Sequence, residues 1–346
     1  MTVPTKQKAL IIPSKQALPV VDAIDVPQPE AGEVLVRIEA AALNPADWKV
    51  HAFGWLDKYP AILGFDGAGV VAKVGEGLVP GNIAPIRFAT FQQYSIVPAE
   101  FAAKIPSNLT FDQAATIPVG LGTGVNGLYA PFTPSLERSG VGLVPFWHEG
   151  GRGKYAGQPI LVLSGATSVG QNAIQLAKLS GFSPIISTAS AHNAEFLKSL
   201  GATHVVDRSL PATEIVEQVK KIAGGPLKYI YDGVGVPDVQ QQGIELLAEG
   251  GYLVSVLPVS GDLKQKASSE KKHTAFPHGS FYLPQFKQIG AEVFKRLTPL
   301  LETGDIKPNV PEYIPGGLAG IPEGFERLKN NKVSARKIVV RPPETA

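Results

Sequence analysis

The sequence predicts an α/β protein in which a doubly wound parallel sheet is joined to a second domain rich in β-strands. Strand-like and helix-like segments alternate between residues 160 and 257, and repeated βα units of this length are typical of parallel sheets with right-handed crossovers. Before residue 111, strand patterns dominate and helical periodicity is weak. The 346 residues exceed what one hydrophobic core usually serves, so two domains are expected.

The N-terminal region shows three strand patterns. Residues 34–40 form a strand-like run after a turn rich in proline and glycine, and residues 93–97 form a shorter strand-like run. Residues 64–71 contain three glycines, which predict a bend before a further strand. We therefore expect a small barrel-like or irregular β domain.

A helical region and a long connection follow. Residues 112–116 resemble a helix start, and residues 119–129 continue as an apolar helix that contains glycine. Residues 131–158 are rich in proline and glycine and carry Trp147 and His148, which predicts a long loop. Loops of this length are uncommon and often functional, so this loop is a candidate border of a site.

The alternating region is the basis for the parallel sheet. We predict strands at residues 160–163, 184–188, 204–207, 229–232 and 252–257, with helices at 169–179, 194–200, 215–223 and about 243–249. Gly201 is expected to end the second helix in a left-handed conformation.

The tail from residue 294 does not continue this alternation. It predicts a short helix, a turn, another helix and a last strand at residues 337–341. We expect the tail to close the β-rich domain. The predicted domains are residues 1–124 with 285–346, and residues 125–284.

Composition excludes several classes of protein. The chain has no cysteine, which removes disulfides, thiol nucleophiles, iron–sulfur clusters and cysteine-ligated zinc. Its six histidines show no tight ligand spacing, so no metal is expected. A net charge of +2 argues against nucleic-acid binding. No apolar run suits a membrane helix and the first residues lack a signal-peptide core, so we expect a soluble, cytoplasmic protein.

A glycine-containing turn at residues 164–170 joins the first strand of the alternating region to its helix. Such a turn suits a pyrophosphate, because the helix N-terminus offers backbone N–H groups and small residues let phosphates approach. The candidate contacts in this turn are Thr167, Ser168, Val169 and Gly170. The position of the turn after a strand and before a helix favours a dinucleotide site.

The end of the second strand favours NADPH over NADH. Sites for NADH usually carry a carboxylate here for the ribose hydroxyls, but this tract has none before Glu195. Its polar residues Ser190, His192 and Asn193 would tolerate a 2′-phosphate. Arg208, just past the third strand, either adds a cation or is a solvated loop arginine.

Other catalytic patterns are absent. None of the nine tyrosines has a lysine four residues on, which disfavours the short-chain dehydrogenase mechanism. The sequence contains no Gly-x-Ser-x-Gly elbow, His-Glu-x-x-His pair or Walker loop.

Several segments in order resemble the medium-chain dehydrogenase/reductase superfamily, and specifically its zinc-free, quinone-oxidoreductase-like branch. They are the Asn-Pro-x-Asp signature within residues 42–49, the glycine-rich residues 63–71, the turn at 164–170, residues 231–235 and the closing residues 332–340. Within this branch, residues 190–193 and 278–282 are similar to fungal trans-acting enoyl reductases. The resemblance implies a GroES-like catalytic domain and a Rossmann-type cofactor domain.

The resemblance also implies site residues. NADPH would be bound by the 167–170 turn, the 190–193 tract, Leu257, Ser334 and Ala335. Zinc-dependent relatives carry a cysteine and a histidine where this chain has Asn44 and Phe65, so the resemblance implies a zinc-free enzyme.

Roles are proposed for further residues, each beside a structural alternative. Asn44 would donate a hydrogen bond near the nicotinamide or the substrate carbonyl, or is a turn asparagine before Pro45. Tyr282 and His278 would line the substrate pocket and supply a proton, or belong to a loop anchored by an aromatic residue. The other candidates are Asp47 and Thr123 for the cofactor, and Trp48, His278 and Phe281 for the substrate.

These residues predict an NADPH-dependent reductase of activated C=C bonds in enones, alkenals or enoyl thioesters. Quinone reduction and non-catalytic NADPH binding remain alternatives. The expected partner is a small-molecule or acyl-thioester substrate, with no nucleic acid and no membrane, and the chain is expected to be a monomer or a homodimer.

Overall fold

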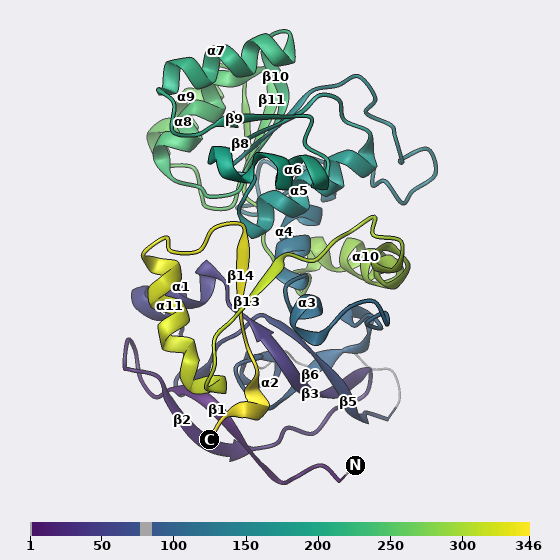
Figure 1. Cartoon of the computed structure of the whole chain (residues 1–346), viewed down its shortest axis with the longest axis vertical. Coiled ribbons are helices and arrows are strands. Elements are labelled where there is room, and N and C mark those ends of the chain that lie inside the picture. The colour runs from purple at the N-terminus through teal and green to yellow at the C-terminus, as the bar shows by residue number, and fades with distance from the viewer. Residues whose placement is uncertain (1, 77–84) are drawn as a thin grey trace. The chain divides into compact units, whose positions relative to one another are not determined.

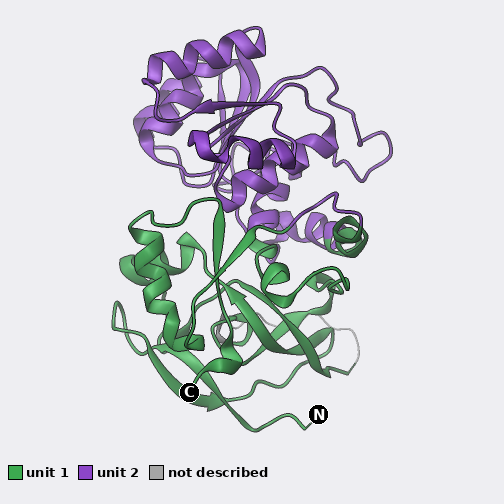
Figure 2. Cartoon of the chain, viewed as in Figure 1, with its two compact units in different colours: residues 1–119, 294–302, 308–346 green, residues 120–293, 303–307 purple. Residues whose placement is uncertain are grey.

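The computed structural model describes residues 2–76 and 85–346, and it contains two compact units (Figures 1 and 2). Unit 1 comprises residues 1–119, 294–302 and 308–346, and unit 2 comprises residues 120–293 and 303–307. Unit 1 is therefore built from both parts of the chain that flank unit 2. The predicted α/β fold class, with a curled β domain and a parallel-sheet domain, is confirmed.

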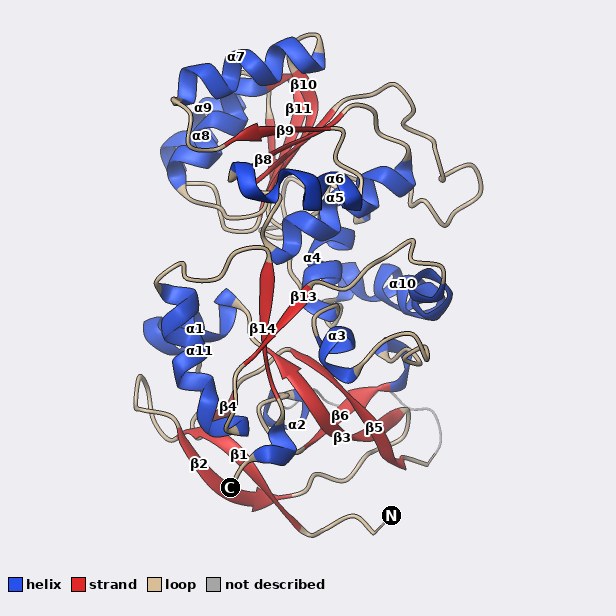
Figure 3. Cartoon of the chain, viewed as in Figure 1, coloured by secondary structure: helices blue, strands red, loops and turns tan. Residues whose placement is uncertain are grey.

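Unit 1 is organised around two sheets (Figure 3). The smaller has the order β2 (Val20–Asp25), β1 (Lys6–Ile12), β4 (Ala61–Ile62). The larger has the order β13 (Val310–Tyr313), β14 (Arg336–Val340), β3 (Glu33–Ala42), β5 (Asp66–Val74), and β6 (Tyr94–Pro98) also pairs with β3. Leu43, Phe91 and Ile338 lie in its core. The C-terminal strand β14 thus completes a sheet begun near the N-terminus.

Short helices surround these sheets. They are α1 (Pro45–Phe53), α2 (Pro85–Phe88), α3 (Phe111–Ala115) and α11 (Ile321–Lys329), with 3₁₀ turns at Ala99–Phe101, Gly317–Gly320 and Pro342–Glu344. Two helices contain residues of both units, α4 (Pro118–Tyr129) and α10 (Pro284–Glu302). The short helix expected after residue 294 is wrong, because α10 begins at Pro284 and runs for 19 residues. Proline is favoured at a helix start, which explains the earlier beginning.

Unit 2 contains a parallel sheet with the order β12, β11, β10, β7, β8, β9. The strands are β7 (Ile160–Leu163), β8 (Ile185–Ala189), β9 (His204–Asp207), β10 (Leu227–Asp232), β11 (Leu247–Ser255) and β12 (His273–Ala275). The direction in which strands are added reverses between β7 and β10. In doubly wound sheets, ligands bind at the carboxyl ends of the strands beside such a reversal.

Helices cover both faces of this sheet (Figure 3). They are α5 (Ser168–Ser180) and α6 (Ala194–Leu200) on one face, and α7 (Ala212–Ala223), α8 (Pro237–Leu246) and α9 (Gly261–Ser269) on the other, with a 3₁₀ turn at Ala191–Asn193. Val219 and Ile244 pack on Leu161 and Leu253 in the core below α7 and α8. This arrangement is the predicted doubly wound sheet.

Two local predictions in unit 2 are wrong. The helix expected at residues 243–249 lies at Pro237–Leu246, and residues from Leu247 onward already belong to β11. Pro237 starts the helix early, and buried Leu247 pairs with Leu227 in the sheet. Gly201 is the C-cap of α6 and has a positive φ, as expected, but its φ of 128° and ψ of −2° lie outside the left-handed helical region.

The long loop at residues 131–158 is confirmed, since it contains no helix or strand. Aromatic contacts hold it: Trp147 lies edge-on to Tyr129 at 5.2 Å, and Tyr155 stacks on Phe182 at 4.8 Å. The indole N–H of Trp147 also donates to Glu292 at 3.0 Å. The loop is therefore fixed to the body of unit 2.

Candidate cofactor and active site

The predicted glycine turn of unit 2 connects β7 to α5. Thr167 is the N-cap of α5, and its hydroxyl accepts the N–H of Gly170 at 3.0 Å. A Cβ on Gly170 would lie 2.7 Å from Gly165 Cα and from the Ser164 carbonyl oxygen. Only glycine fits this approach of helix to turn. The turn and the positive end of α5, including Ser168 and Val169, therefore fit a pyrophosphate.

A second turn at the end of β10 lies against the first. A Cβ on Gly233 would be 2.5 Å from the Thr167 hydroxyl, and a Cβ on Gly235 would be 2.6 Å from Leu257 Cβ. Buried Asp232 shapes this turn by accepting the N–H groups of Val234 at 2.9 Å and Gly235 at 3.0 Å.

Asp232 was not among the residues predicted for the site. Its other oxygen accepts the hydroxyl of Ser255 at 3.0 Å, and burial raises the pKa of the carboxyl group. The available signal in the sequence was a carboxylate at the last position of a buried strand, directly before a glycine turn.

The residues predicted for the 2′-phosphate gather where β8 and β9 end. Ser190 follows β8 and Arg208 follows β9, and the guanidinium Nε donates to the Ser190 hydroxyl at 3.0 Å. Exposed His192 and buried Asn193 lie on the adjoining 3₁₀ turn. These side chains offer a cation and neutral hydrogen-bonding groups to an anion.

One carboxylate was overlooked at this edge. Asp207 ends β9, opposite Ala189 of β8, and accepts the N–H of Ser209 at 2.9 Å. Hydrogen bonds from Ser209 lower the pKa of Asp207, with smaller contributions from Arg208 and His192. The carboxylate of Asp207 therefore accepts hydrogen bonds within its own turn.

The segment after β12 carries three predicted substrate residues. His278 accepts the Ser280 N–H at Nδ1, 3.1 Å, and burial lowers the pKa of His278 to about 4. Its imidazole is therefore neutral near pH 7. Phe281 is buried against Gly290, where a Cβ would lie 2.4 Å from the ring, and Tyr282 is half-buried. Tyr282 is thus the more accessible of the two aromatic residues.

Helix α4 supports this segment. The Asn126 amide Nδ2 donates to the backbone oxygen of His278 at 2.7 Å. Thr123, which is 7% exposed, accepts the Tyr231 hydroxyl at its backbone carbonyl, 2.8 Å. Apart from Thr123 on α4, the predicted residues of unit 2 therefore belong to three clusters: the two glycine turns, the β8–β9 edge and the segment after β12.

Unit 1 contains a buried polar cluster made of Asn44, Asp47, Asp66 and Lys337. The Lys337 ammonium lies 2.6 Å from Asp66 Oδ2 and 3.0 Å from Asn44 Oδ1. Asn44 Nδ2 donates to Asp66 Oδ2 at 2.8 Å. The Lys337 side chain is 3% exposed and that of Asp66 is 0% exposed.

Asp47 completes the cluster from the first turn of α1. It accepts the Asn44 backbone N–H at 2.7 Å through Oδ2 and the Gly64 N–H at 3.1 Å through Oδ1. Burial raises the pKa of Asp47 to about 7, partly offset by the hydrogen bond from Asn44. Both carboxylate oxygens of Asp47 therefore accept backbone N–H groups, one from Asn44 and one from Gly64.

Sequence reasoning found Asn44 and Asp47 but missed Asp66 and Lys337. The signal for Lys337 was its place as the second of two adjacent basic residues, directly before the apolar run Ile338, Val339 and Val340 of β14. A charge within a buried strand requires a partner.

The remaining predicted residues of unit 1 lie near the surface. Trp48 is half-buried on α1, with its ring 6.3 Å from that of Phe53 and 5.7 Å from the Lys49 ammonium. Ser334 is exposed, and Ala335 has a φ of 55° just before β14.

The residues at the family's zinc positions do not fit zinc. Phe65 has no donor atom, and the Asn44 side-chain oxygen already accepts the Lys337 ammonium. Within residues 2–76 and 85–346, no group of three histidine, aspartate or glutamate side chains is arranged to hold a metal ion.

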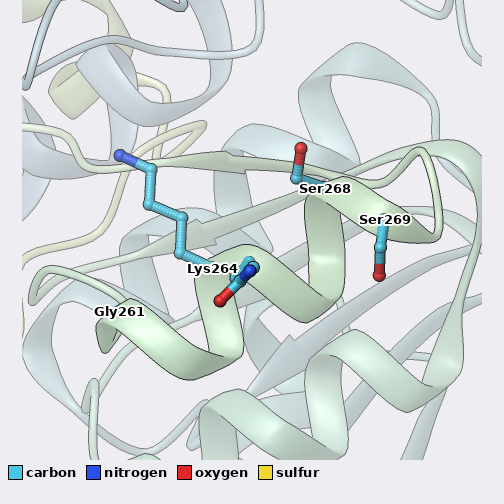
Figure 4. Close-up of a pocket in the computed structure, with 5 residues that line it drawn as sticks. Gly261, Lys264, Ser268 and Ser269 are labelled. Carbon is cyan, nitrogen blue, oxygen red and sulfur yellow. The ribbon is translucent and has the colours of Figure 1, made fainter.

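Other surface features do not add to the site. An open hollow of about 550 Å³ lies along α9, lined by Gly261, Lys264, Gln265, Ser268 and Ser269 (Figure 4). Its lining comes from one helix and includes no predicted residue.

Across the described ranges, none of the helices combines the length and apolar character needed to cross a bilayer.

Comparisons with known proteins cover both units. Residues 30–107 match the alcohol dehydrogenase GroES-like domain, and residues 168–270 match the zinc-binding dehydrogenase family. A zinc-type alcohol dehydrogenase-like protein of Schizosaccharomyces pombe is 30% identical over 96% of this chain and 99% of its own length. A trans-enoyl reductase of Aspergillus japonicus is 31% identical over 89% of each chain.

Solved structures share the fold over nearly the whole length. An alcohol dehydrogenase superfamily protein from Novosphingobium aromaticivorans has a TM-score of 0.76 at 25% identity, covering 97% of this chain and 99% of its own. The crotonyl-CoA carboxylase/reductase AntE, solved in complex with NADP, has a TM-score of 0.73 at 19% identity, covering 98% of this chain and 95% of its own.

Proposed function

Because this chain belongs to the medium-chain dehydrogenase/reductase superfamily and is an oxidoreductase, with fungal trans-enoyl reductases among its relatives, we propose that it is a zinc-free, NADPH-dependent reductase of activated C=C bonds. The proposed substrates are enones, alkenals or enoyl thioesters. The observation that carries the proposal is the buried carboxamide of Asn44, held by Asp66 and Lys337 where a zinc enzyme would carry a metal ligand.

Unit 2 would bind the cofactor. The two glycine turns receive the pyrophosphate at the start of α5, and Arg208 with Ser190 receives the 2′-phosphate. Leu257 borders the second turn, and Thr123 is assigned to the nicotinamide carboxamide. In unit 1, Ser334 and Ala335 are assigned further cofactor contacts.

The chain's residues then act on the substrate. When bound, reduced nicotinamide supplies the hydride for the β-carbon of the substrate. Asn44 donates an N–H to the carbonyl oxygen, where negative charge develops as the C=C bond is reduced. Tyr282 is assigned the delivery of a proton to the α-carbon, and it is favoured over His278, whose imidazole is neutral at pH 7 because burial lowers its pKa to about 4. Trp48 and Phe281 are assigned to the apolar part of the substrate site.

Acceptor specificity tests the activity. We expect purified protein to oxidise NADPH, followed by loss of nicotinamide absorbance, faster with enones and enoyl thioesters than with quinones. Quinone turnover alone would replace the proposal with quinone reduction, for which a quinone oxidoreductase of similar fold, from Coxiella burnetii, is a precedent. Tight NADPH binding without turnover of any acceptor would leave a non-catalytic binding protein.

Arg208 tests the choice of cofactor. Since its guanidinium lies at the β8–β9 edge, Arg208→Ala should raise KM for NADPH about 10-fold and leave KM for NADH nearly unchanged. Arg152→Ala, which removes an exposed arginine paired with Asp305, is the matched control and should change neither. Equal affinity of the unaltered protein for both cofactors would contradict the assignment.

The setting of the protein is also proposed. We place it in the cytoplasm as a monomer or homodimer acting on a diffusible or acyl-thioester substrate. Fractionation of cells that make the protein tests the location, and sedimentation of the purified protein tests the oligomeric state.

A further inference from the structure

Four segments that are distant in the sequence meet in the buried cluster around the Asp66 carboxylate. Asn44 precedes α1, Asp66 begins β5 and Lys337 lies in β14. Asp66 Oδ1 also accepts the backbone N–H of Val119, in the first turn of α4, at 2.7 Å. Each oxygen of Asp66 therefore has a defined donor, which fixes the carboxylate plane.

The polarity of the Asn44 amide is dictated by its neighbours. Its oxygen lies 3.0 Å from an ammonium, which can only donate, and its nitrogen lies 2.8 Å from a carboxylate, which can only accept when ionised. A flipped amide would direct N–H groups at the ammonium and oxygen at the carboxylate. The two charges thus select a single orientation.

This orientation limits what Asn44 can offer. Its oxygen accepts from Lys337, and one of its two amide protons is donated to Asp66. The second amide proton is the donor left for a ligand. Asn44 is 5% exposed, so only a small part of the residue is accessible to a ligand.

We infer that Lys337 and Asp66 are positioning residues, which hold Asn44 so that its carboxamide serves the reaction as a single, oriented N–H donor. This inference rests on the proposed function, in which Asn44 meets the developing negative charge. Preorganised donors stabilise such charge without reorganising during the reaction. Lys337 supplies the buried positive charge of the cluster, and it acts through Asn44.

Direct action of Lys337 on a ligand is the competing explanation. Two of its ammonium contacts are to Asn44 and Asp66, and among the described residues no further hydrogen-bond partner of Nζ is found. A third N–H would then face the ligand. The two explanations differ in whether Lys337 matters once the amide of Asn44 has been removed.

A double-mutant cycle between positions 44 and 337 separates them. Lys337→Met, Asn44→Ala and the double variant are compared with the unaltered protein for kcat and KM with NADPH and an enone. We expect Lys337→Met to lower kcat about 10- to 100-fold when Asn44 is present, because small displacements of a catalytic group are costly, and less than about 2-fold when it is absent. Lys337→Arg, which keeps a donor and the charge, should restore part of kcat.

Two further variants serve as controls, the first for loss of folding and the second for removal of a lysine elsewhere. Lys337→Met leaves the Asp66 carboxylate buried without its cation, which can destabilise the fold. The double variant D66N/K337M, which removes both charges, is therefore measured with Asn44 and with Asn44→Ala. The thermal midpoint of each variant is recorded. Lys329→Met removes an exposed lysine of α11 that pairs with Glu326 at 3.7 Å, and it should leave kcat and KM unchanged.

The outcomes are distinct. Equal fold-losses of kcat with and without Asn44 would overturn the inference while leaving the reductase intact, and they would assign Lys337 to the ligand. No turnover by the unaltered protein would remove the proposed function and the inference with it. If the unaltered protein turns over and Lys337→Met lowers kcat only when Asn44 is present, the result supports both the proposed function and the inference.

Discussion

At the scale of single residues, the carboxyl group of Asp47 links the buried polar cluster to pH. Its pKa rises from 3.8 to about 7 on folding, mainly because burial disfavours the charged form. Between these two pH values the folded chain binds more protons at this site than the unfolded chain does. The contribution of Asp47 to stability therefore falls as pH rises through this window and is lowest above pH 7.

Asp47→Asn tests this linkage, because asparagine cannot ionise. The variant loses one acceptor for a backbone N–H and should be less stable at pH 4. Its deficit relative to the unaltered protein should shrink by at least about 1 kcal/mol between pH 4 and pH 7. Urea unfolding at several pH values measures the difference, with exposed Asp57→Asn as control. A deficit that grows with pH would contradict the direction of the shift.

Residue chemistry also sets the limit of what the sequence predicts about the site. Asn44 and Thr167 belong to local sequence motifs, so their neighbours along the chain mark them, and the structure shows that Thr167 is the N-cap of α5. Lys337 and Asp66 have no local motif to mark them. They are partners because β14 and β5 belong to one sheet, across 271 positions of sequence.

At the scale of elements, the turn between β7 and α5 depends on the absence of a side chain. Gly170→Ala would place a Cβ 2.7 Å from the backbone of the same turn, and backbone cannot yield as a flexible side chain does. We expect a loss of about 1–3 kcal/mol in unfolding free energy and at least ~10-fold weaker NADPH binding. Calorimetric titration and urea unfolding measure the two effects.

Gly261→Ala is the matched control. Gly261 begins α9, and a Cβ there meets nothing within 4 Å. Alanine favours helices more than glycine does, so this variant should be neutral or slightly more stable. Equal losses from both substitutions would show that the close approach at Gly170 is not the cause.

Elements also show which parts of the fold can be read from sequence. The strands β7 to β10 follow from apolar runs between helical periodicities, and the structure has each of them. The boundary between α8 and β11 was misplaced because buried Leu246 and Leu247 suit either structure. Pairing of Leu247 with Leu227 decides it, and such pairing is tertiary information.

At the scale of the whole molecule, unit 1 is completed by strand β14. Val339 of this strand is fully buried and pairs with Ala42 of β3. Val339→Asp would bury a charge without a partner, which costs several kcal/mol, about 3–5. We expect backbone amides of β3 and β5 to lose protection from hydrogen exchange while those of β7 and β8 in unit 2 keep it.

Arg336→Asp serves as the control in the same strand. Arg336 is exposed, so the substitution should leave amide protection in both units nearly unchanged. Loss of protection in β7 together with β3 after Val339→Asp would show that the units unfold as one.

The contact between Lys337 and Asp66 also affects when the buried cluster can form during synthesis of the chain. The ribosome adds about 5–20 residues per second, so the 271 positions between these residues correspond to roughly 15–55 s of synthesis. Throughout that interval Asp66 and Asn44 exist without the cation that orients them, while the sheet of unit 2 has all its strands by residue 275. A nascent chain can therefore hold every strand of the unit 2 sheet roughly 3–12 s before Lys337 is added, and the buried cluster around the Asn44 carboxamide is completed only after that sheet.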